Sequence, residues 1–267
     1  MSHTESLRPV ALTVAGSDSG GGAGIQADLK VFAALGVHGT STITCLTAQT
    51  PAGVHGVHAV PRAFVERQLE TLTREMPPAA AKTGMLFNAG IIRAVVDAMG
   101  RGPRIPWVVD PVMIATSGAR LLRPDAMRAL QDRLLPLAAL VTPNLDEAAV
   151  LMGRPLGSID DLRWAARGIH GRWGVPALVK GGHLRDVPEA TDIFWDGREE
   201  RILRAPFVPG VSTHGTGCTY SAAITAYLAL GHPMPEAVER AKRAITRAIR
   251  RSTRLGPDGR FETLLPG

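Results

Sequence analysis

The chain alternates between short apolar runs and longer stretches in which apolar residues recur at helical spacing. Short apolar runs bounded by Gly, Pro or polar residues predict buried strands, whereas apolar residues three and four positions apart predict helices with one buried face. The predicted strands are residues 10–15, 41–46, 79–85, 107–109, 139–142 and 177–180. The predicted helices are residues 25–35, 61–76, 88–99, 124–135, 144–152 and 159–173. This alternation predicts right-handed crossovers and a mostly parallel sheet covered on both faces.

Two further segments predict antiparallel edges of this sheet. Residues 192–195 and 201–203, joined by a turn that contains Asp196 and Gly197, are typical of a β-hairpin. His55 and His58 alternate with valines in another segment that predicts an edge strand. The chain contains no repeat, low-complexity tract or linker, so we expect one domain over residues 1–267. Residues 1–9 and 256–267 are expected to be peripheral tails.

Composition narrows the class of protein. Hydrophobic residues make up 45% and charged residues 20% of the chain, which indicates a globular protein rather than a disordered one. Residues 1–8 are polar and lack the apolar core of a signal peptide, and no apolar run is as long as a membrane span. With only two cysteines, Cys45 and Cys218, the sequence favours a reduced, cytoplasmic protein without a membrane partner.

The net charge of +6 raises the question of nucleic-acid binding. Much of the excess lies in residues 239–251, where apolar residues recur at helical spacing and arginines occupy the remaining positions. This pattern predicts an amphipathic surface helix with a solvated basic face. Aromatic residues are only 4% of the chain, too few for base-stacking platforms, so no nucleic-acid partner is expected. A basic balance also suits an enzyme that handles anionic phosphates.

A glycine-rich turn leading into a small-residue helix carries the strongest chemical signal. Residues 212–218 read Ser-Thr-His-Gly-Thr-Gly-Cys. The start of a helix exposes unpaired N–H groups, and Gly215 and Gly217 lack the Cβ atoms that would keep a phosphate away from them. Cys218 falls in the first helical turn, where the helix dipole is expected to favour its thiolate. An ordinary loop-to-helix turn with a buried cysteine is the alternative interpretation.

A second glycine-rich segment follows the first predicted strand. Residues 15–28 read Ala-Gly-Ser-Asp-Ser-Gly-Gly-Gly-Ala-Gly-Ile-Gln-Ala-Asp, with five glycines in nine residues and Asp18 and Asp28 at the edges. The spacing matches neither a Walker A loop nor a dinucleotide fingerprint, so the motif alone does not name a ligand.

Together the two segments resemble the vitamin-kinase branch of the ribokinase superfamily, and most closely the hydroxymethylpyrimidine/phosphomethylpyrimidine kinases of thiamin biosynthesis. The resemblance covers about residues 10–255. It implies a ribokinase-like three-layer α/β/α fold with a central, mostly parallel sheet and a small antiparallel edge hairpin. It also implies that Gly215, Thr216, Gly217 and Cys218 form a catalytic anion hole. Most sugar kinases of the superfamily have Asp where this chain has Cys218, which argues against ribose, fructose or adenosine as substrate.

The resemblance further implies two sets of binding residues. Those implied for the substrate are Gly16, Asp18, Ala23, Asp28, Gln49, Met85, Val112 and His214. Those implied for ATP and Mg²⁺ are Asp110, Asn144, Glu147, Lys180 and Thr213, with Asp110 and Glu147 organising the metal through water. The primary amide of Gln49 is complementary to an aminopyrimidine, and small apolar neighbours lack the groups needed to bind a sugar. Asn144 and Glu147 equally match a plain helix cap.

The predicted function is an ATP- and Mg²⁺-dependent kinase that phosphorylates 4-amino-5-hydroxymethyl-2-methylpyrimidine and then its monophosphate, giving the diphosphate. Two alternatives stay open from the sequence, a pyridoxal/pyridoxine kinase of the same superfamily and a non-catalytic nucleotide- or vitamin-binding regulator. A homodimer is also expected. Whether Cys218 acts as a base or only positions the substrate stays open, because phosphoryl transfer relies mainly on positioning and charge stabilisation.

Overall fold

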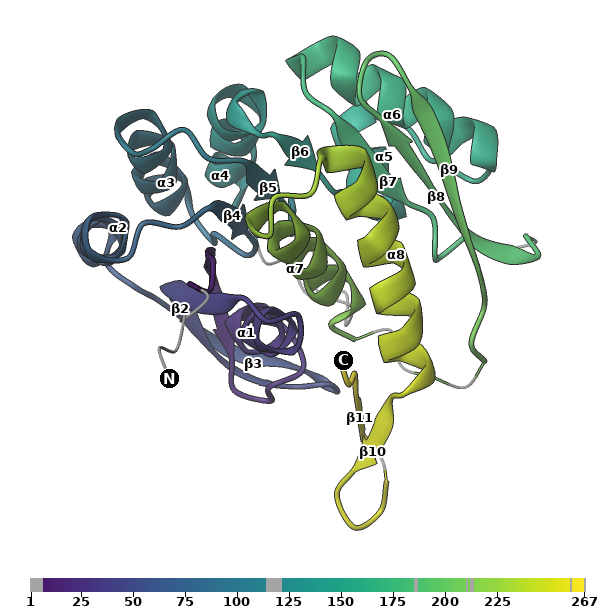
Figure 1. Ribbon diagram of the computed structural model, residues 1–267, viewed down its shortest axis with the longest axis horizontal. Helices are drawn as coiled ribbons and strands as arrows, with labels where there is room; N and C mark the ends of the chain where they lie inside the picture. Colours follow the sequence, from purple (N-terminus) through teal and green to yellow (C-terminus); the bar gives the residue numbers. More distant parts are fainter. Residues whose placement is uncertain are drawn as a thin grey trace, which may run out of the picture.

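The computed structural model describes residues 7–113, 122–184, 187–209, 211, 214–259 and 261–266. Within these residues a nine-stranded sheet forms the middle layer of the protein, in the order β3-β2-β1-β4-β5-β6-β7-β8-β9 (Figure 1). Its strands are β1 (Val10–Asp18), β2 (His38–Thr50), β3 (Gly53–Ala59), β4 (Ala80–Thr83), β5 (Trp107–Val109), β6 (Leu140–Val141), β7 (Ala177–Lys180), β8 (Glu189–Trp195) and β9 (Glu200–Pro206).

The neighbouring strands β2, β1, β4, β5, β6 and β7 run parallel to one another. The strands at the two edges of the sheet are antiparallel to their neighbours. β3 returns beside β2, and β8 and β9 form the hairpin that follows β7. Both predicted edges and the α/β fold class are therefore confirmed. The central parallel strands β4, β5, β6 and β7 are short and almost wholly buried, as expected when helices cover both faces of a sheet.

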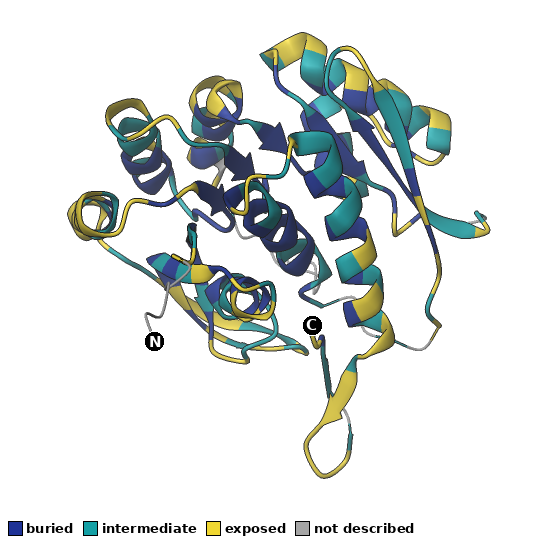
Figure 2. Ribbon diagram, in the orientation of Figure 1, coloured by how far each residue is buried: buried dark blue, intermediate teal, exposed yellow. Residues whose placement is uncertain are grey.

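Within the described ranges, eight α-helices lie on the two faces of the sheet. They are α1 (Gly24–Ala34), α2 (Arg62–Glu75), α3 (Ala89–Arg101), α4 (Pro124–Ala129), α5 (Leu145–Met152), α6 (Ile159–Trp173), α7 (Thr216–Ala229) and α8 (Met234–Arg250). Helices α2 to α6 pack into one hydrophobic cluster, and α1, α7 and α8 pack into another on the opposite face. Within β5, Val109 belongs to the first cluster and Val108 to the second, because successive strand residues face opposite sides. Figure 2 shows α7 buried along most of its length.

Two elements differ from the sequence prediction. The helix expected over residues 124–135 is α4 followed by a π-helical turn, η1 (Leu130–Leu134), and a 3₁₀ turn, η2 (Leu135–Leu137). Pro136 has no N–H to continue an α-helix, which accounts for the end of the helical segment. Strand β2 is longer than the expected residues 41–46, because β3 pairs with its second half.

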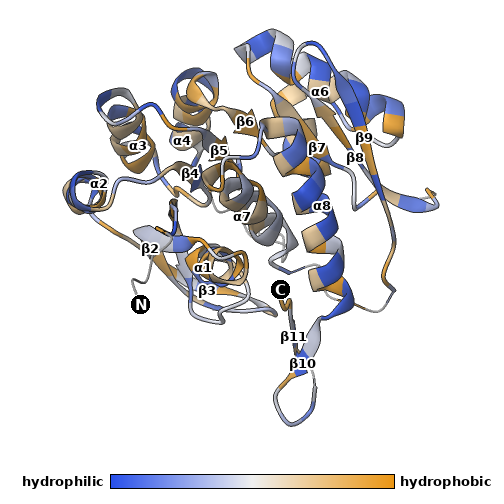
Figure 3. Cartoon of the chain, in the orientation of Figure 1, coloured by the Kyte–Doolittle hydropathy of each residue, from blue (hydrophilic) through white to orange (hydrophobic). Residues whose placement is uncertain are grey.

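The C-terminal part of the chain lies against the second cluster. Helix α8 packs against α7 through its apolar side, as the amphipathic pattern predicts. Hydrophilic residues recur along the same helix (Figure 3). A hairpin of β10 (Thr253–Leu255) and β11 (Phe261–Thr263) follows, and Leu264 after it is buried in the second cluster. In the described ranges, no helix is both long and apolar enough to cross a lipid bilayer.

The parallel arrangement gathers polar residues at one edge of the sheet. Asp18 ends β1, Asp110 follows β5, and Lys180 ends β7. Since the carboxyl ends of parallel strands meet at the same edge, these side chains and the loops after them converge. The N-terminus of α7 lies at this edge, where the candidate site is found.

Candidate active site

A cavity of about 290 Å³ opens at the carboxyl edge of the sheet, beside the start of α7. Most residues predicted for the site line it: Gly16, Asp18, Ala23, Gln49, Met85, Asp110, Val112, Asn144, Glu147, Lys180, His214, Gly215, Thr216, Gly217 and Cys218. Asp28 is buried elsewhere, and Thr213, like Ser212, lies outside the described residues. The structure thus brings together side chains that are up to about two hundred positions apart in the sequence.

The two glycine-rich segments interlock at the mouth of this cavity. Gly215 has a φ of 79°, and a Cβ atom on it would collide with the carbonyl oxygen of Gly22. A Cβ atom on Gly22 would lie 2.7 Å from Cδ2 of His214. Glycine is therefore required at Gly215, where backbone blocks any side chain, and a side chain at Gly22 would have to displace the ring of His214.

The side chain of Asp18 stabilises the turn of the first glycine-rich segment through hydrogen bonds to its backbone. Its carboxylate accepts hydrogen bonds from the backbone N–H groups of Gly20 at 2.8 Å and Ala23 at 2.8 Å, and lies 3.5 Å from Nε2 of His214. Burial acts to raise the pKa of Asp18, but the His214 contact and these N–H groups outweigh it and hold the pKa below its usual value. Asp18 therefore stays ionised and ties the first glycine segment to the second.

The N-terminus of helix α7 lies at the cavity and presents backbone N–H groups to it. Gly215 is its N-cap, and no side chain caps the first turn among the described residues. By contrast, the side chain of Asn144 caps α5 and that of Ser158 caps α6. The N–H groups of the first turn of α7, with the positive end of the helix dipole, form a site suited to an anion.

Cys218 is partly exposed to the cavity in this first turn, but its ionisation differs from the expectation. Burial raises the pKa of the Cys218 thiol to about 11, opposed chiefly by the charge of Lys82 and by a hydrogen bond from the N–H of Gly24. Asp28 and Asp110 raise it further. The expectation that the thiolate is favoured is therefore wrong, because desolvation outweighs the influences that lower the pKa of this thiol.

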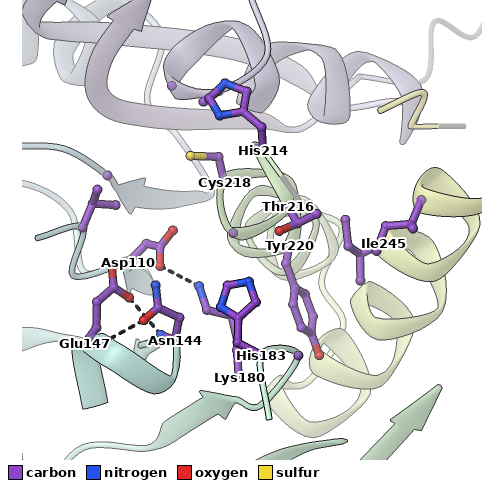
Figure 4. A pocket seen from close by; sticks show the side chains of 18 of the residues that line it. Asp110, Asn144, Glu147, Lys180, His183, His214, Thr216, Cys218, Tyr220 and Ile245 are labelled. Carbon is purple, nitrogen blue, oxygen red and sulfur yellow. Dashed lines mark hydrogen bonds and ion pairs between the residues drawn. The ribbon is translucent and has the colours of Figure 1, made fainter. Parts of the chain in front are cut away.

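Asp110, Lys180 and Glu147 form a cluster of charged groups beside the start of α7 (Figure 4). The Oδ1 atom of Asp110 accepts hydrogen bonds from Nζ of Lys180 at 3.0 Å and from Oγ1 of Thr142 at 3.0 Å. Its Oδ2 atom accepts one from Oγ of Ser221 on α7 at 3.1 Å. Burial acts to lower the pKa of Lys180, yet Asp110 and Glu147 raise it above its usual value, so the ammonium stays charged.

Asn144 and Glu147 form a helix cap and part of the cavity wall at once. The N–H of Asn144 donates to Oε2 of Glu147 at 2.8 Å, and the N–H of Glu147 donates to Oδ1 of Asn144 at 2.9 Å. Glu147 is only 4% exposed, and burial, with Asp110 nearby, raises its pKa to about 7. Two crowded carboxylates are a donor set that fits a divalent cation with retained waters, such as Mg²⁺. In the described ranges no group of three or more His, Cys, Asp or Glu residues forms a complete protein cage for a metal.

Asp28 is the predicted site residue that the fold places elsewhere. Its side chain is fully buried between α1 and the sheet, where it accepts hydrogen bonds from Nζ of Lys82 at 2.8 Å and Oγ1 of Thr13 at 2.6 Å. Asp28 lies on the face of α1 that packs against the sheet, so its carboxylate does not reach the cavity.

Sequence reasoning missed the far end of the cavity. Apolar residues after β9 and on α8 line it, namely Phe207, Val208, Ile245 and Ile249. Nearby, Nζ of Lys242 lies 2.7 Å from Oδ2 of Asp192. The helical spacing of the apolar residues in α8 gave a signal, but it predicts core packing equally well, and nothing in the sequence shows that part of this face borders a cavity.

Comparison with known proteins decides the family. The family model for phosphomethylpyrimidine kinase matches residues 18–262. The chain belongs to this family. A hydroxymethylpyrimidine/phosphomethylpyrimidine kinase of Rhizobium meliloti is 49% identical over 251 residues, which cover 93% of each chain. That of Synechococcus elongatus is 45% identical, over 96% of this chain and 98% of its own. The thiamine biosynthesis bifunctional protein ThiED of Geobacter sulfurreducens is 49% identical over 92% of this chain, which spans 50% of that longer protein.

Solved structures of vitamin kinases share the fold. A phosphomethylpyrimidine kinase from Clostridium difficile has a TM-score of 0.80 and 40% identity, over 91% of this chain and all of its own. An ADP complex of Bacillus subtilis pyridoxal kinase has a TM-score of 0.87 and 37% identity, over 97% of both chains. The names of the curated relatives favour a phosphomethylpyrimidine kinase over a pyridoxal kinase, and both are phosphotransferases.

The first prediction concerns the backbone at the start of α7. A Cβ atom on Gly217 would lie 3.4 Å from Nζ of Lys180 and 3.9 Å from Oδ2 of Asp110. We expect Gly217→Val to place methyl groups between the helix N-terminus and these charges, and so to abolish phosphoryl transfer to either substrate while the protein stays folded. Steady-state kinetics and thermal unfolding measure the two effects.

Gly171→Val is the matched control, because Gly171 is exposed in α6 and a Cβ atom there would meet open space. It introduces the same side chain into a helix far from the cavity and is expected to retain activity. Wild-type turnover by Gly217→Val would show that phosphate does not approach this turn.

Proposed function

We propose that the protein is an ATP-dependent kinase that phosphorylates 4-amino-5-hydroxymethyl-2-methylpyrimidine and then phosphorylates the monophosphate to the diphosphate. One observation carries the proposal. A single cavity joins an apolar end containing Gln49, the bare N-terminus of α7, and the Asp110–Lys180 ion pair. Such a cavity offers a place for a flat alcohol, a transferred phosphoryl group and a polyphosphate along one line.

The pyrimidine end is built from small or apolar groups and one amide. Met85 and Val112 supply apolar surface, and Gly16 cannot be larger, because a Cβ atom on it would lie 2.9 Å from Sγ of Cys45. The Thr47 hydroxyl, which can donate to the carbonyl oxygen of Ser17 at 3.0 Å, also lies 3.2 Å from Oε1 of Gln49. The primary amide of Gln49 offers an NH₂ donor for a ring nitrogen and an oxygen acceptor for an exocyclic amine.

The nucleotide is proposed to occupy the opposite side of the α7 N-terminus. Ile245 and Ile249 on α8 and Phe207 and Val208 after β9 offer an apolar surface for a purine ring. The phosphates would then lie toward Lys180, whose ammonium is a point charge suited to them. Structures of related kinases bound to ADP support the use of ATP.

The proposed chemistry relies on charge and position. The substrate oxygen attacks the γ-phosphorus, and the N–H groups of α7 and the Lys180 ammonium stabilise the charge that spreads over the transferred group. Two carboxylates would hold Mg²⁺ through water, those of Asp110 and buried Glu147. Asp110 is itself fixed by hydrogen bonds from Thr142, Ser221 and Lys180. When bound, Mg²⁺ would neutralise phosphate charge.

The two phosphorylations make different demands on Cys218. In the first, the nucleophile is an alcohol whose proton must leave, and Cys218 is the side chain of α7 placed to accept it. In the second, the nucleophile is a phosphate oxygen with a pKa of about 6, which is already largely ionised at neutral pH. The same anion site would therefore serve both steps, with a base needed only in the first.

The alternatives make different products. A pyridoxal kinase is the second candidate, supported by the fold shared with pyridoxal kinases at TM-scores of 0.86 to 0.88. A binding-only regulator is disfavoured by the retained Cys218, Lys180, Asn144 and Glu147. Purified protein with ATP, Mg²⁺ and either the pyrimidine alcohol or pyridoxine tests all three. We expect pyrimidine mono- and diphosphate; preferential pyridoxine phosphorylation, or no transfer to either, would contradict the proposal.

We also infer that the protein acts in the cytoplasm as a homodimer. Strand β3 supports the homodimer, because it is an antiparallel edge of the sheet whose residues, Val57 among them, are largely exposed. Light scattering on the purified protein measures the mass in solution, and a monomer at micromolar concentration would contradict it.

A second prediction concerns substrate recognition. Gln49→Ala removes the amide that would read the aminopyrimidine, so we expect kcat/KM for the pyrimidine alcohol to fall by the equivalent of about 1–3 kcal/mol. Gln131→Ala is the matched control, since Gln131 lies in η1 outside the cavity. Equal kinetics for both variants and the wild type would remove Gln49 from the binding site.

A third prediction follows from the pKa of Cys218, which burial raises to about 11. A base must be deprotonated to act, and below its pKa the deprotonated fraction grows about tenfold for each pH unit. If the thiolate accepts the alcohol proton, kcat/KM for the first step should rise steadily with pH across the neutral and mildly alkaline range. The second step should rise much less. Parallel pH profiles for the two substrates would rule out Cys218 as the base.

A further inference from the structure

In the described residues, the pairing of β2 with β1 is regular except at one point beside the cavity. Two residues of β2, Thr44 and Cys45, lie opposite a single residue of β1, Gly16. An extra residue in one strand is a β-bulge, which bends the strand and re-aims the side chains that follow it. Bulges recur next to active sites, and Gly16 lines the cavity.

The bulge changes which side chains of β2 are buried. Before it, Thr40 and Thr42 are buried, whereas after it the buried residues are Cys45 and Thr47. Because side chains of a strand alternate between its two faces, one extra residue exchanges the faces for every residue that follows. Thr47 and Gln49 line the cavity. Without the extra residue, the strand would turn both of them to the opposite face of the sheet.

The hydroxyl of Thr44 ties the bulge to the wall of the cavity. Its Oγ1 atom donates to the carbonyl oxygen of Met85 at 2.6 Å, and both residues are buried. Met85 follows β4, which lies beyond β1 in the sheet, so this hydrogen bond crosses β1 at Gly16. Oγ1 of Thr44 also lies 3.8 Å from Sγ of Cys45, but a carbonyl oxygen can only accept, and it therefore takes the hydroxyl proton.

Glycine at position 16 leaves room for this crossing. A Cβ atom on Gly16 would lie 2.9 Å from Sγ of Cys45 and 3.5 Å from Sδ of Met85. The first distance is shorter than an ordinary van der Waals contact, so the Cys45 thiol already fills the space that a side chain on Gly16 would need. Met85 is thus held at its carbonyl group by Thr44, while its sulfur atom lies beside Gly16.

We propose that Thr44 is a positioning residue for the substrate end of the cavity. Its buried hydroxyl fixes Met85 in the cavity wall, and the bulge to which it belongs turns Gln49 toward the same space. The proposal rests on the proposed function for the identity of the substrate, the pyrimidine alcohol. The position of Met85 is a property of the folded chain and can be measured without any substrate.

Both positioned side chains contact the pyrimidine ring in the proposed complex. Met85 supplies apolar surface and Gln49 supplies an amide. A gap of about 1 Å forfeits up to half of the attraction between two apolar atoms, so a flat ring binds poorly to a wall that has moved. Loss of the Thr44 hydrogen bond should therefore weaken binding of the pyrimidine. Binding of the nucleotide on the other side of the α7 N-terminus should not change.

The test compares threonines on the same face of one strand. Thr44→Val removes the hydroxyl and keeps the shape of the side chain. Thr42→Val is the matched control, because in the described part of the chain Oγ1 of Thr42 is buried without a hydrogen-bond partner, and the same change there removes no hydrogen bond. Thr44→Ser keeps the hydroxyl and should behave as the wild type. Thr44→Ala removes the hydroxyl without adding a methyl group, and it takes the place of Thr44→Val if that variant unfolds.

The position of Met85 without substrate is measured by methyl NMR. The protein is labelled with carbon-13 at the methyl groups of its methionines, and the Met85 signal is identified by its loss in Met85→Leu. Thr44→Val should shift this signal by more than its linewidth, because the Met85 backbone loses its anchor. Thr42→Val and Thr44→Ser should leave the signal in place. An unchanged Met85 signal in folded Thr44→Val protein would overturn the proposal.

Steady-state kinetics measures the consequence for substrate binding. In Thr44→Val, the KM for the pyrimidine alcohol should rise about tenfold, with the KM for ATP and kcat within about twofold of the wild type. Equal increases in both KM values, or no increase in either, would contradict the proposal. A displaced Met85 signal in a protein that phosphorylates neither pyrimidine would support the role of Thr44 and refute the proposed function instead.

Discussion

The rest of the site depends on the close approach of two backbone segments. Gly215 at the start of α7 lies so near the carbonyl group of Gly22 that neither position accepts a side chain without displacement. This contact sets the N-terminus of α7 against the first glycine segment. It also brings His214 beside Asp18 and the N–H of Gly24 beside Cys218. A bare helix N-terminus becomes a defined anion site because glycine is retained on both sides.

Around this helix, the described part of the chain contains three Lys–Asp ion pairs, and the two members of each pair come from different segments of the fold. Lys82–Asp28 lies behind the cavity at 2.8 Å, Lys180–Asp110 lies in its wall at 3.0 Å, and Lys242–Asp192 lies toward its far end at 2.7 Å. Their side chains are at most 11% exposed. For Lys82 and Lys180 the paired aspartate raises the pKa of the ammonium despite burial, so these positive charges beside a largely apolar cavity are not lost to desolvation. A cavity of this kind suits a polyphosphate better than a neutral ligand.

Much of the fold followed from periodicity, because strands such as β5 and β7 and helices such as α6 have clear apolar patterns and flanking turns. The anion site was also predictable, since glycine spacing before a helix has a direct physical meaning. Effects that depend on the three-dimensional surroundings of a residue could not be predicted from the sequence. The thiol of Cys218 is governed by burial, and Asp28 is bound to Lys82 fifty-four positions away, which no local pattern reveals. The apolar far end escaped prediction because the α8 residues that line it are indistinguishable in sequence from core residues.

The central claim is that one anion site at the start of α7 serves both phosphorylations. It is tested most directly by adding the pyrimidine monophosphate as an inhibitor of the first step and measuring its inhibition constant against the alcohol. If both substrates occupy the same cavity, inhibition should be competitive with the alcohol, and the inhibition constant should match the dissociation constant of the monophosphate measured by direct binding. Non-competitive inhibition, with the alcohol and the monophosphate bound to one protein molecule at once, would contradict the account.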